Sequence, residues 1–255
     1  MGAGANIQVG ANIPADGLAV HARGLTRRFG SFTAVDALDL DVREGEIFGF
    51  LGANGAGKTT AIRMLCGLLP PTGGAATVAG VAVGAQAREL KRRIGYMSQR
   101  FSLYDDLTVD ENVEFFGGIY GLAGAILGER ADELLPLLGL GDRRRSLAGA
   151  LPLGYKQRLA LGCSLLHRPR VLFLDEPTGG VDPVARRRFW DLIYAQAAAG
   201  TTVFVTTHYM DEAEYCGRVS IMVQGKLVAL DTPRGLKALT GGRDMQDVFL
   251  RLVDA

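Results

Sequence analysis

The sequence has few cysteines. Its 255 residues include three, Cys66, Cys163 and Cys216, an odd number without the spacing of a metal site. We expect all three to lie in helices as reduced, packed thiols of a cytosolic protein. This pattern argues against a disulfide scaffold and against a zinc centre.

The sequence also lacks a long hydrophobic run. The longest uncharged apolar stretch, about residues 115–127, is bounded by Glu114 and Glu129 and interrupted by glycines. A membrane-spanning helix needs roughly 20 apolar residues, so this stretch is too short. No basic segment precedes an apolar core near the N-terminus, and we therefore predict no signal peptide. If the protein acts at a membrane, we expect it to dock there through a partner.

No excess of charge of either sign is present. The formal net charge of +1 argues against nucleic-acid binding by bulk electrostatics, and we predict no nucleic-acid partner. Hydrophobic residues make up 48% of the chain and charged residues 22%, as in ordinary globular proteins. The length suits one large domain, or a core with an inserted subdomain.

A glycine-rich loop stands between an apolar segment and a helical pattern. Residues 46–51 predict a buried strand, and residues 61–69 predict a helix. The loop consists of Gly52, Ala53, Asn54, Gly55, Ala56, Gly57, Lys58, Thr59 and Thr60. It meets the pattern G-x-x-x-x-G-K-[ST] at every fixed position. The alternative, a glycine-rich surface turn, is disfavoured by the strand before the loop and the helix after it.

The residues of this loop suit a polyphosphate. Glycines let backbone N–H groups turn inward and approach the phosphates closely. The helix that follows points its positive N-terminal end at the same phosphates. We expect Lys58 to contact the β- and γ-phosphates and the Thr59 hydroxyl to ligate Mg²⁺.

The flanking segments predict an α/β protein with a helical insertion. Residues 1–16 show no apolar period and predict a poorly ordered leader before a domain over residues 17–255. Residues 18–22 and 37–42 alternate as in strands of an antiparallel edge sheet. No strand is predicted between about residues 100 and 168, which we expect to be an all-helical subdomain inserted in the α/β core.

Polar residues follow several predicted strands. Asp175 and Glu176 come directly after the apolar residues 171–174, at the strand end where open α/β sheets bind ligands. We expect Asp175 to order Mg²⁺ through water and Glu176 to polarise the water that attacks the γ-phosphate. Gln99 and His208 also end predicted strands, where an amide suits Mg²⁺ or the water and an imidazole suits the γ-phosphate. An isolated acidic pair at a strand end is otherwise simply solvated.

Other polar and aromatic residues have less specific interpretations. Phe29 precedes the phosphate loop and offers a face for a base, worth about 1–3 kcal/mol by analogy with nucleic-acid stacking. A core position explains Phe29 equally well. His21 and His167 follow no such pattern and are expected to be structural. The arginine runs at residues 143–145 and 186–188 predict solvated helix faces, and contact with an acidic loop of a partner is the alternative for the first run.

In this order, the motifs resemble the ATP-binding subunit of ABC transporters from about residue 18 onward. The matching motifs are Walker A at residues 52–60, the Q-loop at Gln99, the signature at residues 151–158, Walker B at residues 171–176, the D-loop at residues 180–182 and the switch histidine at His208. The resemblance implies an α/β fold, a P-loop NTPase core of mixed parallel sheet with an antiparallel β edge sheet and an inserted all-helical subdomain.

The resemblance also implies residue roles. ATP and Mg²⁺ are the expected cofactors, with Phe29 stacking on adenine and Thr59, Gln99 and Asp175 near the metal. Glu176 and His208 are the expected catalytic residues. In this family the signature of one subunit closes over the Walker A loop of another, so Leu151, Leu153, Gly154 and Tyr155 would meet the partner's nucleotide and Asp182 would lie at the dimer interface.

The function that the resemblance implies is ATP hydrolysis coupled to transport. Residues 96–104, 207–214 and 246–249 are most similar to the type-2 exporter subgroup, which moves drugs, antibiotics or other compounds outward. Such a subunit energises a separate multi-spanning permease and is cytoplasmic, peripheral on the inner face of the cell membrane. The alternative is a soluble ABC-type ATPase that uses ATP-dependent dimerisation as a regulatory or assembly switch. Relatives of that kind usually carry two cassettes or long coiled-coil insertions, and this sequence shows neither.

The signature departs from the family pattern. The common form is Leu-Ser-Gly-Gly-Gln, whereas this chain has Pro152 in place of the serine and Leu153 after it. Proline offers neither the hydroxyl nor an amide proton, although Leu153, Gly154 and the helix start keep their N–H groups. Losing a hydrogen bond to a charged group costs about 1.5–3 kcal/mol unless another group replaces it. The affected site would be the partner's, in a head-to-tail dimer with an identical chain or a related ATPase.

Overall fold

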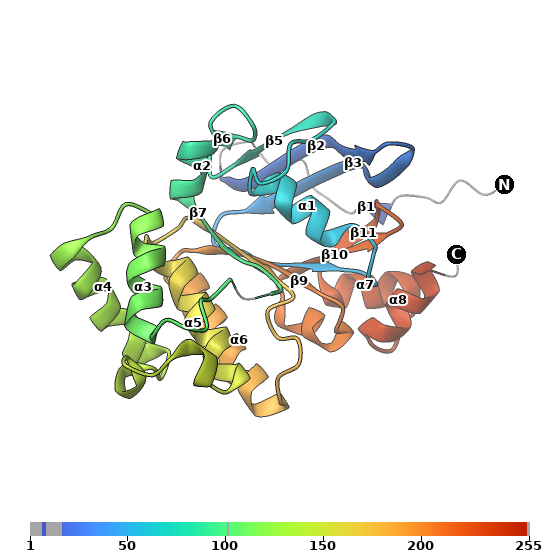
Figure 1. Ribbon diagram of the computed structural model, residues 1–255. Helices are drawn as coiled ribbons and strands as arrows, with labels where there is room; N and C mark the ends of the chain where they lie inside the picture. Colours follow the sequence, from blue (N-terminus) through green and yellow to red (C-terminus); the bar gives the residue numbers. More distant parts are fainter. Residues whose placement is uncertain (1–6, 9–16, 101, 254–255) are drawn as a thin grey trace.

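Two β-sheets lie one above the other with a helix between them, and further helices cover the lower face of the larger sheet (Figure 1). This arrangement comes from a computed structural model that describes residues 7–8, 17–100 and 102–253. The leader expected over residues 1–16 lies outside these residues apart from β1 (Ile7–Gln8), which pairs in parallel with β11 (Lys226–Asp231).

The larger sheet has seven strands in the order β1-β11-β10-β4-β9-β8-β7. Its remaining strands are β4 (Ile47–Leu51), β7 (Ile94–Met97), β8 (Val171–Asp175), β9 (Thr202–Thr207) and β10 (Arg218–Val223). The strands from β10 to β7 are parallel, and β11 runs antiparallel to β10. Because the carboxyl ends of parallel strands share one edge, residues far apart in sequence meet there.

Strand β8 shows why its sequence is apolar without interruption. Phe173 packs in the layer between the two sheets, whereas Leu172 and Leu174 pack against the helices below. Successive side chains of a strand point to opposite faces, so a strand covered on both faces needs apolar residues throughout. Phe204 of β9 lies at the centre of the upper layer, with its ring centroid 5.3 Å from those of Phe48 and Phe173.

The smaller sheet is antiparallel, with strand order β3-β2-β5-β6. Its strands are β2 (Leu18–Phe29), β3 (Phe32–Arg43), β5 (Gly73–Val78) and β6 (Val81–Ala82). The strands expected at residues 18–22 and 37–42 were therefore too short. Register shifts between Ala22 and Arg28 break the alternation of side chains while the ladder continues, so a period of two does not reveal the second half of β2.

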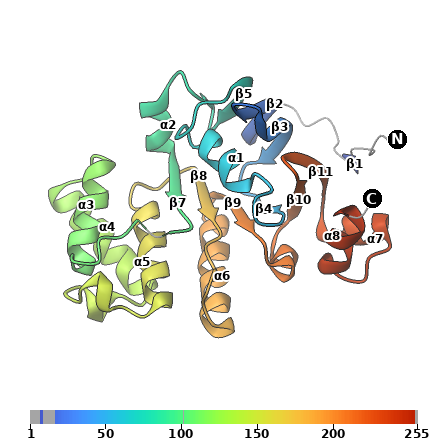
Figure 2. The same ribbon diagram turned by 45° about the vertical axis from the view of Figure 1, so that its right-hand side comes forward.

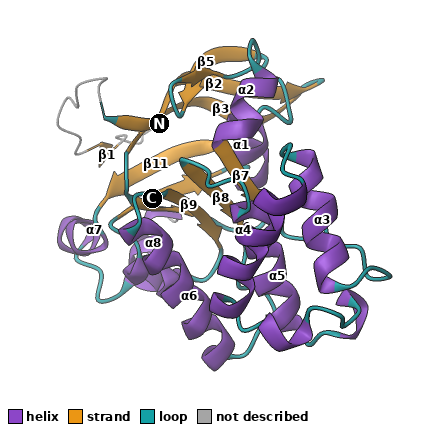
Figure 3. Cartoon of the chain, turned by 90° about the vertical axis from the view of Figure 1, so that its left-hand side faces the viewer, coloured by secondary structure: helices purple, strands orange, loops and turns teal. Residues whose placement is uncertain are grey.

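Helix α1 (Lys58–Leu65) fills the space between the two sheets (Figure 3). Its side chains Ile62, Met64 and Leu65 are fully buried there. Helix α2 (Ala87–Arg93) lies beside α1 and precedes β7. The buried face of α1 fixes the phosphate loop at its N-terminus above the edge of the larger sheet.

The lower layer is helical. Its elements are α3 (Val109–Ile119), α4 (Gly124–Leu137), α5 (Leu153–Leu165), α6 (Pro183–Ala198), α7 (Pro233–Thr240), α8 (Met245–Val253) and the short 3₁₀ segments η1 (Gly141–Arg143), η2 (Ala148–Ala150) and η3 (Met210–Tyr215). Figure 2 shows α3, α4 and α5 grouped to one side, away from α7 and α8. Between β7 and β8 the described residues form no strand, only an isolated bridge between Thr108 and Leu147. The bounds of a helical subdomain over this interval remain a prediction.

Thr108 and Glu111 have the sequence spacing of a capping box, and the structure forms this box at the start of α3. The Thr108 side chain accepts from the Glu111 amide, and the Glu111 carboxylate accepts from the Thr108 amide. This reciprocal pair satisfies two N–H groups that a helix start leaves free. It sets where α3 begins after the extended segment that contains Gln99.

The cysteines are free and buried, but only one lies inside a helix. Cys163 is in α5, whereas Cys66 caps the C-terminal end of α1 and Cys216 follows η3 in an extended conformation. The expectation of three helical cysteines was therefore wrong in two cases. In the part of the chain that the structure describes, no helix is long and apolar enough to span a membrane.

The sequence predicted solvated arginine runs, but the structure shows that one arginine in each run is paired with acidic residues. Arg144 donates to Asp110 at 2.8 Å and also binds Asp132. Arg186 is only 21% exposed and binds Asp211. The acids that pair with these arginines come from other segments, so no pattern within either run distinguishes the paired arginine from its exposed neighbours.

His167 is packed as a neutral ring. It stacks on Tyr120 with ring centroids 3.6 Å apart, and its Nε2 lies 2.8 Å from the Ile94 carbonyl oxygen. Nδ1 is buried and has no hydrogen-bond partner among the described residues. Burial lowers the pKa of His167 below its ordinary value, because the charged ring loses water.

This environment predicts an acid-sensitive contribution to stability. Because the folded pKa of His167 lies below the ordinary 6.5, the unfolded chain binds the proton more readily, and stability falls as the pH drops through that value. His167→Gln removes this term, which is at most about 1.4 kcal/mol per pH unit. Urea unfolding at about pH 7.5 and about pH 5.5 should show wild type losing more stability than the variant. Equal losses in both proteins would contradict the assignment.

Candidate functional site

The phosphate loop connects β4 to α1 as the sequence predicts. Gly57 has a φ of +104°, and a Cβ there would collide with the Ala34 carbonyl oxygen, so only glycine fits. The Ala56 amide donates to the Ala53 carbonyl at 3.1 Å, which closes the loop. Helix α1 starts at Lys58 without a side-chain cap, so its first N–H groups remain available to an anion.

The Lys58 side chain extends back toward the first residues of the phosphate loop. Its side chain is 4% exposed, and Nζ donates to the carbonyl oxygens of Gly52 at 2.8 Å and Ala53 at 3.1 Å. The same nitrogen lies 3.3 Å from Oε1 of Glu176, which is 8% exposed. A buried ammonium of this kind needs such oxygen partners, and γ-phosphate oxygens are of the same type.

Asp175 ends β8 beneath the start of α1. Its Oδ1 accepts from the Thr59 hydroxyl at 3.1 Å and from the Thr206 hydroxyl at 2.8 Å. Burial raises the pKa of Asp175, because the carboxylate is removed from water. A hydroxyl and a carboxylate within 3.1 Å form an all-oxygen pair of the kind that Mg²⁺ takes together with phosphate oxygens and water. The residues present therefore fit the metal that the sequence implies.

Glu176 is the centre of the site. Its backbone has a φ of +49°, unusual for a residue with a side chain, and its amide donates to Thr206 O at 3.1 Å and Thr206 Oγ1 at 3.0 Å. Oε2 accepts from Gln99 Nε2 at 2.9 Å and lies 3.1 Å from His208 Nδ1. Lys58, Gln99 and His208 thus converge on one carboxylate.

The structure separates the predicted metal ligands into two groups. Thr59 and Asp175 are in direct contact, whereas Gln99 contacts Glu176. The role of Gln99 toward the metal therefore remains a prediction. Thr206 was missed, although it links Asp175 to Glu176. The signal was a pair of threonines at the end of β9, directly after the apolar residues 203–205.

Phe29 does not occupy a core position. It ends β2 at the hairpin turn and is 47% exposed, with the Arg27 guanidinium 4.5 Å from its ring centroid. The hairpin touches the phosphate loop through Ala34, whose carbonyl oxygen lies against Gly57. Its exposure leaves the ring available to a base, and the stacking itself remains a prediction.

The signature segment starts α5. Pro152 is the N-cap, and its carbonyl accepts from the amides of Tyr155 at 2.9 Å and Lys156 at 3.1 Å. Leu151 is buried, whereas Leu153 is 43% exposed at the start of the helix. The N–H groups of Leu153 and Gly154 therefore stand in the first turn, as the sequence interpretation requires.

Two arginines flank Tyr155. The guanidinium of Arg158 lies 4.2 Å from the ring centroid and that of Arg143 lies 4.5 Å from it. The guanidinium groups, Arg158 first and then Arg143, hold the pKa of the Tyr155 hydroxyl below its ordinary value. The signature therefore presents an aromatic ring with two cations where the family pattern has glutamine.

Asp182 has an internal partner. Its carboxylate caps α6 by accepting from the amides of Val184 at 2.9 Å and Ala185 at 3.0 Å. These N–H groups hold the pKa of Asp182 below its usual range. The carboxylate is thus engaged within its own chain, and its predicted place at a dimer interface remains a prediction.

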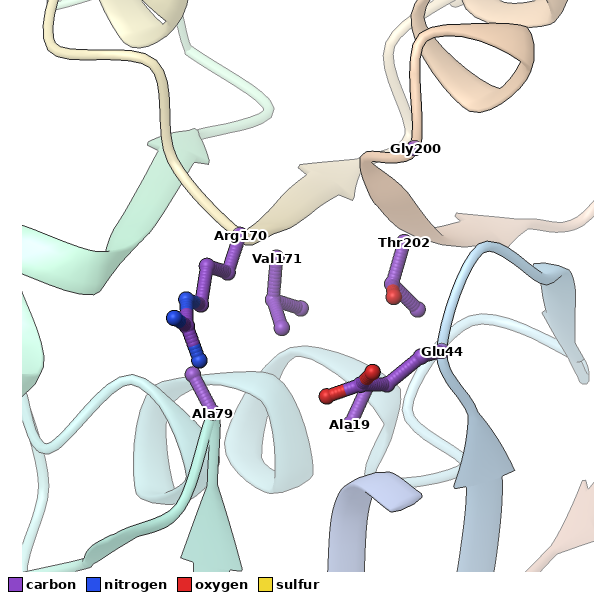
Figure 4. Close-up of a pocket in the computed structure, with 7 residues that line it drawn as sticks. All are labelled: Ala19, Glu44, Ala79, Arg170, Val171, Gly200 and Thr202. Atoms are coloured by element: carbon purple, nitrogen blue, oxygen red, sulfur yellow. The ribbon is translucent and has the colours of Figure 1, made fainter. Parts of the chain in front are cut away.

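A separate cavity of about 230 Å³ lies at the opposite end of the parallel strands (Figure 4). Its lining includes Val171 and Thr202, the first residues of β8 and β9, together with Glu44 and Arg170. The predicted nucleotide residues follow the other ends of the same strands. This cavity is therefore not part of their site.

The fold and site define a P-loop nucleotide-binding protein. The glycine loop between β4 and α1 leads to Lys58 and Thr59 at the start of the helix. The acidic pair Asp175 and Glu176 stands at the end of β8, which is separated from β4 by the single strand β9. Within this class, the chain belongs to the ABC transporter family. The family's sequence profile, described as ABC transporter, matches residues 35–179.

Similar proteins agree with this placement. The chain is 47% identical over 239 residues to the probable multidrug ABC transporter ATP-binding protein YbhF of Escherichia coli. The aligned region covers 92% of this chain and 41% of that protein. It is 45% identical over 228 residues to the daunorubicin resistance ATP-binding protein DrrA2 of Streptomyces coeruleorubidus, covering 89% of this chain and 71% of that one. The chain thus spans less than half the length of the first relative.

A solved structure of the ATP-binding subunit of an ABC transporter superposes with a TM-score of 0.83 at 26% identity. The match covers 92% of this chain and 99% of that one. The predicted fold class, a P-loop core of mixed sheet with an antiparallel sheet and helices, is confirmed.

Proposed function

We propose that the chain is an ATP-binding and ATP-hydrolysing subunit that energises a separate membrane permease. The observation that carries the proposal is the convergence of Lys58, Gln99 and His208 on the Glu176 carboxylate, beside the Thr59–Asp175 pair. The proposal assigns to this arrangement a base, three cationic or polar donors and an oxygen ligand pair beside one phosphate loop. Those are the parts that phosphoryl transfer to water requires.

Each residue has one task in this mechanism. The Glu176 carboxylate accepts a proton from the attacking water, and Lys58 and His208 donate hydrogen bonds to the γ-phosphate oxygens. Asp175 and Thr59 hold Mg²⁺, which neutralises charge on the phosphates when bound. Thr206 keeps Asp175 and Glu176 in register, because its hydroxyl contacts both residues. Phe29 supports the adenine ring by stacking.

The proposal includes a second ATPase subunit. The start of α5 has free N–H groups in its first turn and an exposed Leu153, which suits contact with the nucleotide of a partner. A head-to-tail dimer of identical chains, or of this chain with a related ATPase, completes both sites. If Pro152 weakens the signature, the nucleotide site affected is that of the partner subunit and not that of the chain carrying Pro152.

Export is proposed from the relatives. Two of them carry the names of a multidrug transporter component and of a daunorubicin resistance protein. We infer by similarity that the permease moves drugs or other small compounds outward and that this chain is peripheral on the cytoplasmic face of the cell membrane.

Co-purification and hydrolysis test the proposal together. The tagged chain, expressed at native level, should be recovered from membranes with a multi-spanning protein, and the purified chain should bind ATP and release phosphate in the presence of Mg²⁺. ATP hydrolysis by a chain that is recovered without any multi-spanning protein at native expression would favour the soluble switch. Failure to bind ATP would refute both functions.

A further inference from the structure

A buried polar cluster lies next to the catalytic residues but outside the nucleotide site. At its centre is Glu212, which is 0% exposed and accepts a hydrogen bond of 2.5 Å from the Thr178 hydroxyl. Arg186 approaches the same carboxylate oxygen, with its Nε 3.7 Å away, and binds Asp211 at 3.3 Å. Taking a carboxylate fully out of water is costly unless its partners compensate it.

The members of this cluster come from three segments, and each member lies within four residues of a predicted site residue in the sequence. Thr178 stands two residues after Glu176, in the segment that leads to Asp182 and α6. Glu212 lies in η3, four residues after His208. Arg186 lies in the first turn of α6. One carboxylate therefore ties the loop after Walker B to the segment after the switch histidine.

Contacts between side chains also connect the same cluster to His208. The Arg186 guanidinium lies 4.5 Å from the ring centroid of Tyr209, and that ring lies 4.2 Å from the ring of His208. His208 Nδ1 is in turn 3.1 Å from Glu176. The cluster thus meets both ends of the His208–Glu176 contact, through Thr178 on one side and Tyr209 on the other.

The signature helix joins the same loop. Gln157 of α5 is fully buried, and its Nε2 donates to the carbonyl oxygen of Pro177, the residue before Thr178. The segment 177–182 is therefore held from two directions, by α5 and by η3. A displacement of either element reaches the residue that follows Glu176.

The hydrogen bonding of the cluster is incomplete. Among the described residues, Oε2 of Glu212 and Nε of Arg186 are buried without a hydrogen-bond partner. Their ion pair is 3.7 Å long, beyond hydrogen-bond distance. A small shift of α6 toward η3 would convert this contact into a hydrogen bond and strengthen the cluster.

We propose that Glu212 is a positioning residue that couples the loop 177–182 to the segment carrying His208, so that both move together when the site closes. Glu212 contacts no residue predicted to bind nucleotide and acts through Thr178 and Arg186. The kinetic part of this proposal rests on the proposed ATPase function, whereas the structural coupling does not.

The test compares Glu212→Gln, Thr178→Val and Thr178→Ser with the exposed control Arg187→Gln. Hydrogen exchange of the full chain should show faster exchange in residues 177–182 and 208–212 for Glu212→Gln and Thr178→Val. Thr178→Ser, which keeps the hydroxyl, and Arg187→Gln should match wild type. Exchange in the phosphate loop, residues 52–59, should stay unchanged in all four variants.

Kinetics supply the second readout. In Glu212→Gln and Thr178→Val, kcat should fall roughly 10- to 100-fold, as for a misplaced catalytic group, while KM for ATP changes by less than about twofold. Thr178→Ser should restore kcat.

A lower melting temperature with unchanged local exchange and unchanged kcat would show a packing role only and overturn the proposal. If Glu212→Gln does not fold, the comparison of Thr178→Val with Thr178→Ser tests the proposal by the same exchange and kinetic measurements. If wild type hydrolyses no ATP, the proposed function fails, and the exchange data alone decide the coupling.

Discussion

Replacing Glu176 with glutamine is expected to remove ATP hydrolysis while ATP binding persists. The amide has nearly the shape of the carboxylate but cannot accept a proton from water. General-base catalysis contributes about 10²- to 10⁴-fold, so kcat should fall by that factor. Lys58 and the loop N–H groups are untouched, and the Kd for ATP should therefore change little. Phosphate release and titration with a fluorescent ATP analogue measure the two quantities.

Glu214→Gln is the matched control for this variant. Glu214 is an exposed acid that binds Lys237 and does not contact the site, so its variant should hydrolyse ATP like wild type. Hydrolysis at the wild-type rate in Glu176→Gln would refute the role of Glu176 as base.

The same variant decides the dimer question. Trapped with ATP, Glu176→Gln should double its mass in light scattering if two identical chains form the composite site. A chain that stays monomeric at high concentration excludes the homodimer and leaves the related ATPase as the partner.

Replacing Lys58 with methionine should weaken ATP binding and also destabilise the fold. A charge-assisted hydrogen bond to phosphate is worth about 1.5–3 kcal/mol, which corresponds to roughly 10- to 150-fold in Kd. The same change removes the cation beside Glu176, which is 8% exposed. Breaking one side of a buried pair costs about 3–5 kcal/mol, an upper bound here because Gln99 and His208 still contact Glu176.

Calorimetric ATP titration and urea unfolding measure these two effects separately. Lys226→Met is the control, because Lys226 is 67% exposed and pairs only loosely with Asp36, at 3.6 Å. Wild-type ATP affinity in Lys58→Met would contradict the phosphate contact. Unchanged unfolding would contradict the structural pairing with Glu176.

Many parts of this architecture follow from local patterns. The strand that ends in Asp175 is predicted by its apolar run, α3 by its capping box and the phosphate loop by the spacing of glycines and Lys58. In each case the type of element or the position of its end is encoded by a few neighbouring residues. The length of β2 was not predictable in this way, because its register shifts break the period of two.

Buried polar contacts between distant segments were the part that sequence reasoning missed. Thr206 is an ordinary strand residue by propensity, and only its position beside Asp175 makes it a link to Glu176. Arg186 belongs to a run that predicts a solvated face, yet its Nε approaches the buried Glu212. Neither role has a local signal, since the partner lies on another element.

The sequence by itself determined the chemistry available to this protein: a loop for phosphates, an acidic pair after a strand, an amide and an imidazole after others. Only the tertiary structure decided which of these groups meet. Thr59 reaches Asp175 across 116 residues of chain, and Gln99, His208 and Lys58 reach Glu176 rather than one another. The physical reason is the strand order, because parallel strands that are distant in sequence bring their carboxyl ends to one edge of the sheet.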